Sequence, residues 1–321
     1  MMIVLQTFIA TLDPLLMLFL CLLLGFILKK YNILPESAGT VLSRLETYLL
    51  VPAVSFATFT QYCTPASLSE NAPIVLYACL AITLAVIIAI CLSYAFRVKD
   101  DYKRNIYRYA LTFGNYGFVG NAIVPMILGG DEFLYKYLLF TLPLSFVTYL
   151  WGITILTPKE HRRGSIFKQI LNVPLVTLFI GAILGLTGIG QKLPAFAVNT
   201  VDSLKNCMGP IAMILCGFVI ASYPFKSLLS NVRVYIATLL RLFILPAVIL
   251  LVLYAFGARE NVLVYALFAF ATPLGMNTVV YPAAFGGDPK TGAGMALISH
   301  TLCVVSIPIM YALFQLVMKF I

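Results

Sequence analysis

Long runs of hydrophobic residues recur along the whole chain and alternate with short polar stretches. Each run is about 20 residues long, the length at which an α-helix crosses about 30 Å of hydrocarbon. The pattern predicts ten membrane-spanning helices, at approximately 4–28, 40–60, 72–96, 106–130, 132–156, 173–190, 207–223, 234–257, 262–286 and 291–316. We therefore expect an all-α polytopic membrane protein.

Composition and charge agree with this interpretation. Of the 321 residues, 61% are hydrophobic and 10% are charged, whereas soluble domains are about half apolar and about 25% charged. The first run is not preceded by Lys or Arg and lacks a small-residue cleavage site, so we expect it to remain as a span.

The basic residues indicate the orientation. If the N-terminus is outside, the cytoplasmic loops hold most of the Lys and Arg residues, including Lys29, Arg97, Arg162 and Lys226. Basic loops stay on the cytoplasmic side. We therefore expect a protein of the inner cell membrane with both termini extracytoplasmic. This placement accounts for the net charge of +9 without a nucleic-acid partner.

Motifs for cofactors and metals are missing from the sequence. The seven Cys residues show no CxxC spacing and lie mostly inside spans, so we expect neither a disulfide nor a metal site. No GxxxxGK[ST] motif occurs, so we expect no ATP hydrolysis and no cofactor.

The two halves of the chain resemble each other. The segments "PLLMLFLCLLLG" (14–25) and "PLVTLFIGAILG" (174–185) are identical at six of twelve positions. Further matches at a similar offset are Pro52 with Pro210, Pro125 with Pro282, and "GGD" at 129–131 with "GGD" at 286–288. The chain thus divides into repeats at 1–157 and 173–321, joined by a cytoplasmic linker at 158–172. Because each repeat holds five spans, an odd number, the second must be inverted, as in secondary transporters.

The fourth and ninth spans carry helix-breaking residues near their centres. These are Gly114, Gly117, Gly120 and Pro125 in the fourth span, and Pro273, Gly275 and Pro282 in the ninth. Pro removes an amide donor and Gly favours unwinding, and unwound backbone at this depth must face protein or a wet cavity. Each break would present a helix N-terminus that favours an anion. We expect Asn115, Asn121, Asn277 and Thr278 to bind the solute there, with Gly117 and Gly120 beside them.

Few ionisable residues lie at depth. We expect Arg241, in the eighth span, to attract an anionic solute, or else to reach the headgroups. His300, in the tenth span, is a candidate for proton coupling because its ordinary pKa lies near physiological pH. Asp13, Glu46, Asp131 and Asp202 all fall near predicted span ends, so we expect no carboxylate at the midplane.

The segments "GNYGFVG" (114–120) and "PLGMNTVVYPAAFGGDPKTGAGMALISHTL" (273–302) resemble the auxin efflux carrier family, whose bacterial members include malonate and malate permeases. The resemblance covers the whole chain. It implies a scaffold domain of spans one, two, six and seven, and a transport domain of spans three to five and eight to ten. It also implies that spans four and nine cross where they unwind and that Asn115 and Asn277 bind substrate. Two departures are Asn121-Ala122 where the family has x-Pro, and His300 where a Ser-Thr pair is usual.

We expect a secondary transporter of a small organic anion, a mono- or dicarboxylate, working by alternating access, with possible proton or sodium coupling. A homodimer is expected, although Gly25, Gly181 and Gly185 allow close helix approach either within the chain or across a dimer. The alternatives are a cation- or proton-coupled antiporter on the same scaffold, a non-transporting membrane sensor, and an enzyme using His300 with Ser299 or Ser306. The last lacks an orienting carboxylate.

Overall fold

The computed structural model describes residues 2–158, 160, 172–229, 231–284, 287 and 289–320. Most of the predicted linker at 158–172, and Gly286 and Asp288 of the second "GGD", lie outside these residues. The helices of the first half are α1 (Met2–Lys30), α2 (Ala38–Leu45), η1 (Glu46–Leu50), α3 (Val51–Tyr62), α4 (Pro65–Ala95), α5 (Asp101–Thr112), η2 (Tyr116–Gly120), α6 (Asn121–Leu128), α7 (Asp131–Val147), η3 (Thr148–Gly152) and α8 (Ile153–Leu156).

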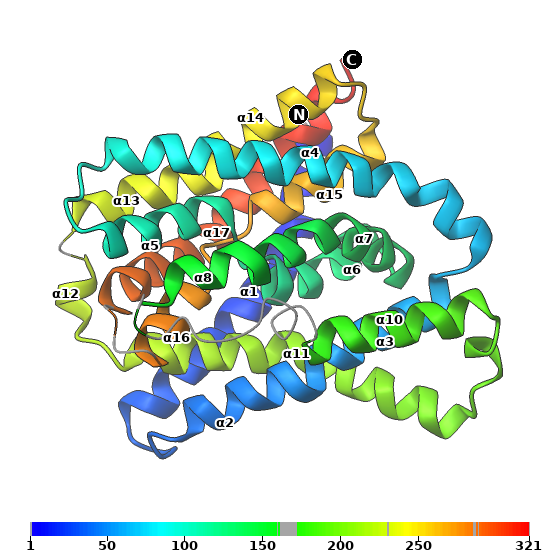
Figure 1. The fold of residues 1–321 in the computed structure, drawn as a ribbon, viewed down its shortest axis with the longest axis horizontal. Helices are drawn as coiled ribbons and strands as arrows, with labels where there is room; N and C mark the ends of the chain where they lie inside the picture. The colour runs from blue at the N-terminus through cyan, green and yellow to red at the C-terminus, as the bar shows by residue number, and fades with distance from the viewer. Residues whose placement is uncertain are drawn as a thin grey trace.

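The helices of the second half are α10 (Val173–Leu186), η5 (Gly190–Lys192), α11 (Ala195–Ala221), α12 (Phe225–Leu229), α13 (Val232–Leu239), η6 (Leu240–Ile244), α14 (Leu245–Ala255), α15 (Glu260–Phe270), α16 (Asn277–Ala284) and α17 (Pro289–Val317). Figure 1 shows these helices packed together, with both chain ends at the same edge of the molecule. Termini on one side fit an even number of crossings.

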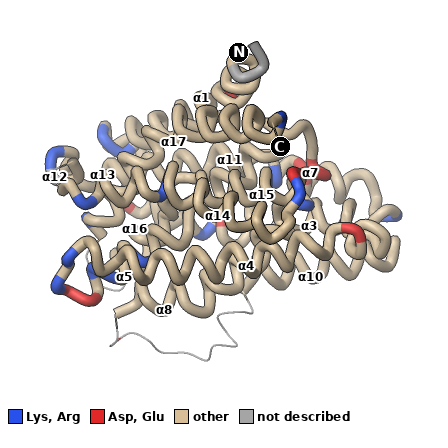
Figure 2. Tube along the Cα trace, turned by 90° about the horizontal axis from the view of Figure 1, so that it is seen from above, with Lys and Arg blue, Asp and Glu red and all other residues tan. Residues whose placement is uncertain are grey.

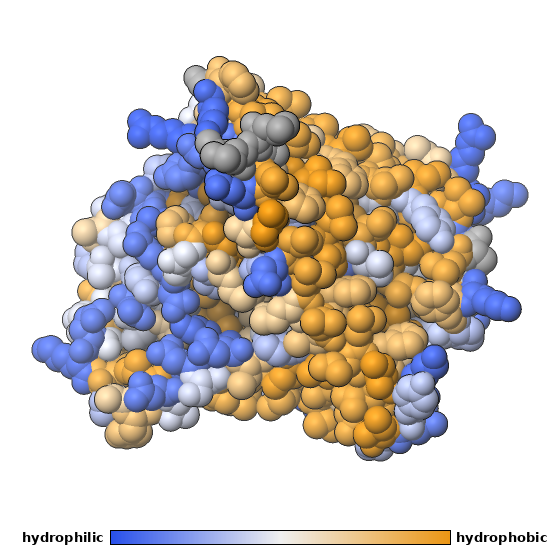
Figure 3. All heavy atoms as spheres, turned by 180° about the vertical axis from the view of Figure 1, so that it is seen from behind, coloured by the Kyte–Doolittle hydropathy of each residue, from blue (hydrophilic) through white to orange (hydrophobic). Residues whose placement is uncertain are grey.

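Within the described part of the chain, six helical stretches are long and apolar enough to cross a membrane. They are Leu5–Lys30, Pro65–Ala95, Asp131–Leu156, Ala195–Ala221, Val232–Ala255 and Pro289–Val317. Hydrophobic side chains cover a broad area of the face in Figure 3, with hydrophilic ones mostly toward its left and right edges. The protein is therefore an all-helical membrane protein, as its hydrophobic pattern predicts.

The helix of the predicted seventh span begins earlier than the expected 207. It starts at Ala195, and its first half carries the polar residues Asp202 and Lys205. The Lys205 ammonium contacts the Asp131 carboxylate of α7 at 2.6 Å and the Asp202 carboxylate at 3.3 Å. Because this first half is polar, hydropathy alone places the start of the helix too late.

Two helix pairs pack with the same close approach, and each pair joins one helix of the first half to one helix of the second half. Helix α1 packs on α11, and α10 packs on α3. A Cβ at Gly25 would collide with the Ile214 backbone of α11, and one at Gly185 would collide with the carbonyls of Phe59 and Cys63 on α3. Gly25 and Gly185 are equivalent in the sequence repeat, so these glycines serve close packing within the chain.

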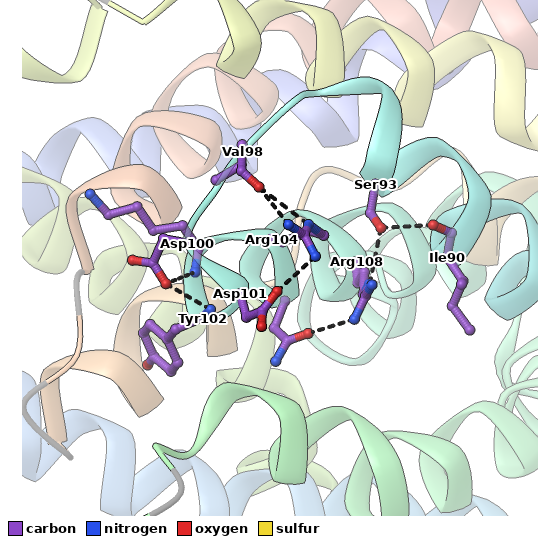
Figure 4. Close-up of polar contacts among 10 residues, drawn as sticks. Ile90, Ser93, Val98, Asp100, Asp101, Tyr102, Arg104 and Arg108 are labelled. Atoms are coloured by element: carbon purple, nitrogen blue, oxygen red, sulfur yellow. Dashed lines mark hydrogen bonds and ion pairs between the residues drawn. The ribbon is translucent and has the colours of Figure 1, made fainter.

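The turn between α4 and α5 fixes the direction of the fourth span (Figure 4). The Asp100 carboxylate caps the first turn of α5 by accepting from backbone amides. The Arg104 guanidinium donates to the Val98 carbonyl at 2.8 Å, and Arg108 donates to the Ser93 hydroxyl at 2.9 Å. Figure 2 shows several basic residues at the end of the molecule where α5 starts, near α12.

Candidate functional site

Two of the predicted spans are interrupted in the middle. One stops at Thr112 and resumes at Tyr116, and the other stops at Phe270 and resumes at Asn277. The two interruptions lie against each other: Gly114 and Leu274 form an isolated antiparallel bridge. The Asn115 amide donates to the Pro273 carbonyl at 2.6 Å, and the Leu274 amide donates to the Ser299 hydroxyl at 3.0 Å. We call this pair of interruptions the crossover.

Each interruption creates a new helix N-terminus. In the η2–α6 segment the first bond to a preceding carbonyl runs from the Val119 amide to Asn115, at 2.9 Å. In α16 it runs from the Thr278 amide to Gly275, at 3.2 Å. Amides ahead of these bonds have no carbonyl one turn back to accept from them. Residues that carry such amides and also line the cavity described below include Gly117, Phe118, Met276 and Asn277.

The C-terminal ends of the two first half-helices share one buried cation. The Arg241 guanidinium donates to the carbonyls of Leu111 and Thr112 at 3.0 and 3.2 Å, and to Ala269 at 3.3 Å. It also lies over the Phe270 ring, 5.5 Å from its centroid. A helix C-terminus carries partial negative charge and unpaired carbonyls, so a guanidinium there is favourable. Arg241 therefore joins α5 to α15.

This position corrects the sequence interpretation of Arg241. The side chain is 0% exposed, and Arg241 is not among the residues that line the cavity. It reaches neither the cavity nor the surface of the described structure, because the carbonyls of both half-helices already hold it. Gly114 makes room for it, since a Cβ there would collide with Arg241 Nη2 and the Thr272 hydroxyl. The requirement at Gly114 is thus close packing.

A cavity of about 760 Å³ reaches the crossover. From the crossover it extends to residues in the second half of α2, at the C-cap of α8 and at the N-cap of α10, namely Ser43, Thr157 and Asn172. These residues border the loops predicted to be cytoplasmic. Among the described lining residues none is Lys, Arg, His, Asp or Glu; most of the polar ones carry hydroxyls or carboxamides. The described lining is therefore a mixture of apolar and polar residues without a charged side chain.

The crossover carboxamides are held by neighbouring side chains. Asn115 Nδ2 lies 3.1 Å from His300 Nε2, and His300 Nδ1 lies 2.8 Å from the Ala296 carbonyl. With Nδ1 protonated, this network makes Nε2 the acceptor for Asn115, so the ring is neutral. Asn277 Nδ2 donates to the Tyr109 hydroxyl at 2.7 Å. Both carboxamides line the cavity. His300 orients Asn115, and its part in proton coupling stays a prediction.

Two other expected ligands do not line the cavity. Thr278 is fully buried, and its hydroxyl donates to the Gly275 carbonyl at 2.9 Å. Gly120 packs against Tyr137, whose hydroxyl a Cβ at Gly120 would strike. Both residues shape the crossover, because one closes its turn and the other lets α7 approach.

Asn121 does line the cavity, and its Oδ1 atom has no hydrogen-bond partner among the described residues. Pro125 and Pro282, expected as helix breakers, lie inside α6 and α16. Pro282 is five residues beyond the start of α16, so the carbonyl that loses its donor lies near the helix start, and Pro125 is nine residues beyond the start of η2. Neither proline interrupts its helix; the interruptions lie at residues 113–115 and 271–276.

Sequence reasoning missed one wall of the cavity. Thr141, Ser145 and Thr148 all line it, and the Tyr116 hydroxyl lies 3.0 Å from Thr148 Oγ1 and 3.4 Å from Ser145 Oγ. The spacing i, i+4, i+7 puts these hydroxyls on one helix face. That polar stripe in an apolar span is the signal that could have found them.

Comparison with known proteins identifies the class. The model of the membrane transport protein family, that of the auxin efflux carriers, matches residues 10–165 and again residues 161–311. The chain belongs to this family. The family is one of transporters and not of enzymes, and its model matches each half once, as the sequence repeat predicts. The resemblance drawn from the two crossover segments is confirmed.

A curated member of similar length is an uncharacterized transporter of Methanocaldococcus jannaschii. It is 24% identical over 307 residues, which cover 92% of this chain and 96% of the relative. The match extends through both halves, so the two proteins are similar over the whole membrane domain.

Proposed function

We propose that this membrane transport protein is a secondary transporter of a small organic anion, a monocarboxylate, that binds at the crossover. The observation that carries the proposal is the pair of helix N-termini whose leading residues line one cavity, in which no described lining residue is charged. Each N-terminus is equivalent to about half a positive charge. Asn115 and Asn277 add carboxamide donors beside them.

The same electrostatics favours one carboxylate over two. Arg241 is committed to backbone carbonyls, and the described lining of the cavity holds no cation. Two half-charges balance one carboxylate, whereas the second group of a dicarboxylate would enter the membrane interior without a partner, which is costly. The hydroxyls and Tyr rings of the wall suit the uncharged remainder of the solute.

The closure of the cavity supports our proposal of alternating access. The cavity extends from the crossover toward the predicted cytoplasmic loops. On the opposite side, Lys205 of α11 is joined to Asp131 of α7 at 2.6 Å. In our proposal α1, α3, α10 and α11 belong to the scaffold, and the crossover belongs to a transport domain that moves against them. Ten crossings with inverted repeats, extracytoplasmic termini and a homodimer remain predictions within this account.

Uptake into proteoliposomes tests the function. A panel of mono- and dicarboxylates is offered to the wild type, to Asn115→Ala and Asn277→Ala, and to Asn199→Ala, an exposed residue of α11. We expect saturable monocarboxylate transport that both crossover variants reduce at least about tenfold and that Asn199→Ala leaves unchanged. Equal transport by all four proteins would refute the site. Cation exchange would favour the antiporter, and binding without flux would favour a sensor.

A further inference from the structure

Glu46 is a buried carboxylate that sequence reasoning placed near a span end. The structure places it at the start of the π-helical stretch η1, where its side chain is 0% exposed. Neither carboxylate oxygen has a hydrogen-bond partner among the described residues. Short π-helical stretches occur often at functional sites, and an ionisable side chain within a span is a functional candidate by default.

The surroundings of Glu46 require the neutral acid. An ionised carboxylate taken from water into a protein interior costs several kcal/mol unless a cation or donors compensate it. Helices α2, α3, α10 and α11 pack on η1. Arg44 at the end of α2 is exposed and forms no ion pair with Glu46, and α10 carries no titratable residue. Tyr62 at the end of α3 and Cys63 just after it lie more than three helical turns beyond Glu46 along the chain. Among the described residues, the Cys216 thiol of α11, a helix packed on η1, interacts electrostatically with Glu46.

Cys216 also connects Glu46 to the crossover. Its Sγ atom lies 4.0 Å from Asn115 Nδ2. Two neighbours of Glu46 line the cavity: Ser43, which is about one turn before it, and Thr47, which follows it directly. Glu46 therefore lies just behind the cavity wall, next to the contact between α11 and the crossover. Movement of the crossover during transport would change what surrounds Glu46.

We propose that Glu46 is a proton-binding site and that its protonated form stabilises the conformation described here. The proton moves from water to a Glu46 oxygen when this conformation forms, and it returns to water when Glu46 ionises and becomes hydrated in another conformation. The consequence for transport is that one proton accompanies one monocarboxylate. This consequence rests on the proposed function. Sodium fits the site less well because it needs several oxygen ligands, and neither Glu46 oxygen has a hydrogen-bond partner among the described residues.

Infrared difference spectroscopy tests the proton site without any assumption about transport. We expect the purified protein at neutral pH to show the band of a protonated carboxyl shielded from solvent. Glu46→Gln should lose that band, whereas Glu36→Gln should keep it, because Glu36 is exposed and paired with Lys29. The proposal is overturned if the wild-type spectrum shows no such band, or if Glu46→Gln leaves the band unchanged.

Uptake driven by a pH gradient tests the coupling. One proton per solute predicts about tenfold accumulation for each unit of pH gradient. Glu46→Gln, which mimics the neutral acid in shape, should exchange solute across the membrane but lose this accumulation, and Glu36→Gln should keep it. Accumulation by Glu46→Gln, or accumulation that follows sodium, would overturn the coupling. If the wild type moves no carboxylate, the proposed function fails, while the infrared result still decides the proton site.

Discussion

Replacing Arg241 by Met should destabilise the crossover strongly. Met keeps much of the side-chain volume but removes every donor, so the carbonyls of Leu111 and Thr112 lose their side-chain donor, whereas the Ala269 carbonyl keeps the Thr272 hydroxyl. Such carbonyls are buried beyond the reach of water, and a buried acceptor left without a donor costs about 1–3 kcal/mol. Two such carbonyls together cost about 2–6 kcal/mol, and we expect Arg241→Met to lose about 3–5 kcal/mol.

Thermal unfolding of the purified protein in detergent measures this effect. A loss of about 3–5 kcal/mol corresponds to a fall in Tm of about 6–20 °C. Arg233→Met is the matched control, because Arg233 at the start of α13 is exposed and its loss should change stability by less than about 0.5 kcal/mol. Arg241→Lys should lie between the two, since an ammonium replaces only part of the guanidinium contacts.

The same variants separate two roles for Arg241. If it holds the half-helices together, Tm falls together with solute affinity. If it were the partner of the anion, solute affinity would fall while the Tm of the solute-free protein stayed near that of Arg233→Met. The second outcome would refute our account of Arg241.

Three further changes test other contacts. Lys205→Met should weaken the closure between α11 and α7. A loss of about 1 kcal/mol raises the outward-open population about fivefold. Spin-label distances between these helices measure that population, and unchanged distances would contradict the prediction. His300→Phe should raise the solute Kd about tenfold because Asn115 loses its acceptor, whereas His300→Gln should retain more affinity; equal affinities in equilibrium binding would argue against a positioning role. Gly120→Ala should lower Tm because of the contact with Tyr137, while Gly117→Ala, which has open space, should not; the reverse order would show that the packing is wrong.

The sequence predicts where the chain departs from regular helix, because Gly, Pro and Asn mark such places directly. Residues 114 and 273 lie in the interruptions that the structure shows. The pattern does not reveal which breakers interrupt a helix. Pro125 and Pro282 follow the starts of η2 and α16 by nine and five residues and are accommodated within α6 and α16.

Long-range partners are what sequence reasoning could not supply. The ligands of Arg241 are backbone carbonyls about 130 and 28 residues away, and carbonyls leave no trace in residue identity. Glu46 has the position of an interfacial residue along the chain, yet packing of α11 against η1 buries it. Both corrections concern ionisable groups, whose environment is decided by the tertiary structure.

A density map of the purified protein with its best-transported monocarboxylate bound tests the central claim most directly. Our account predicts the fourth and ninth spans interrupted at residues 113–115 and 271–276, with the carboxylate about 2.7–3.2 Å from amides of Gly117, Phe118, Met276 or Asn277. Continuous helices through these positions, or a carboxylate bound to Arg241, would contradict it.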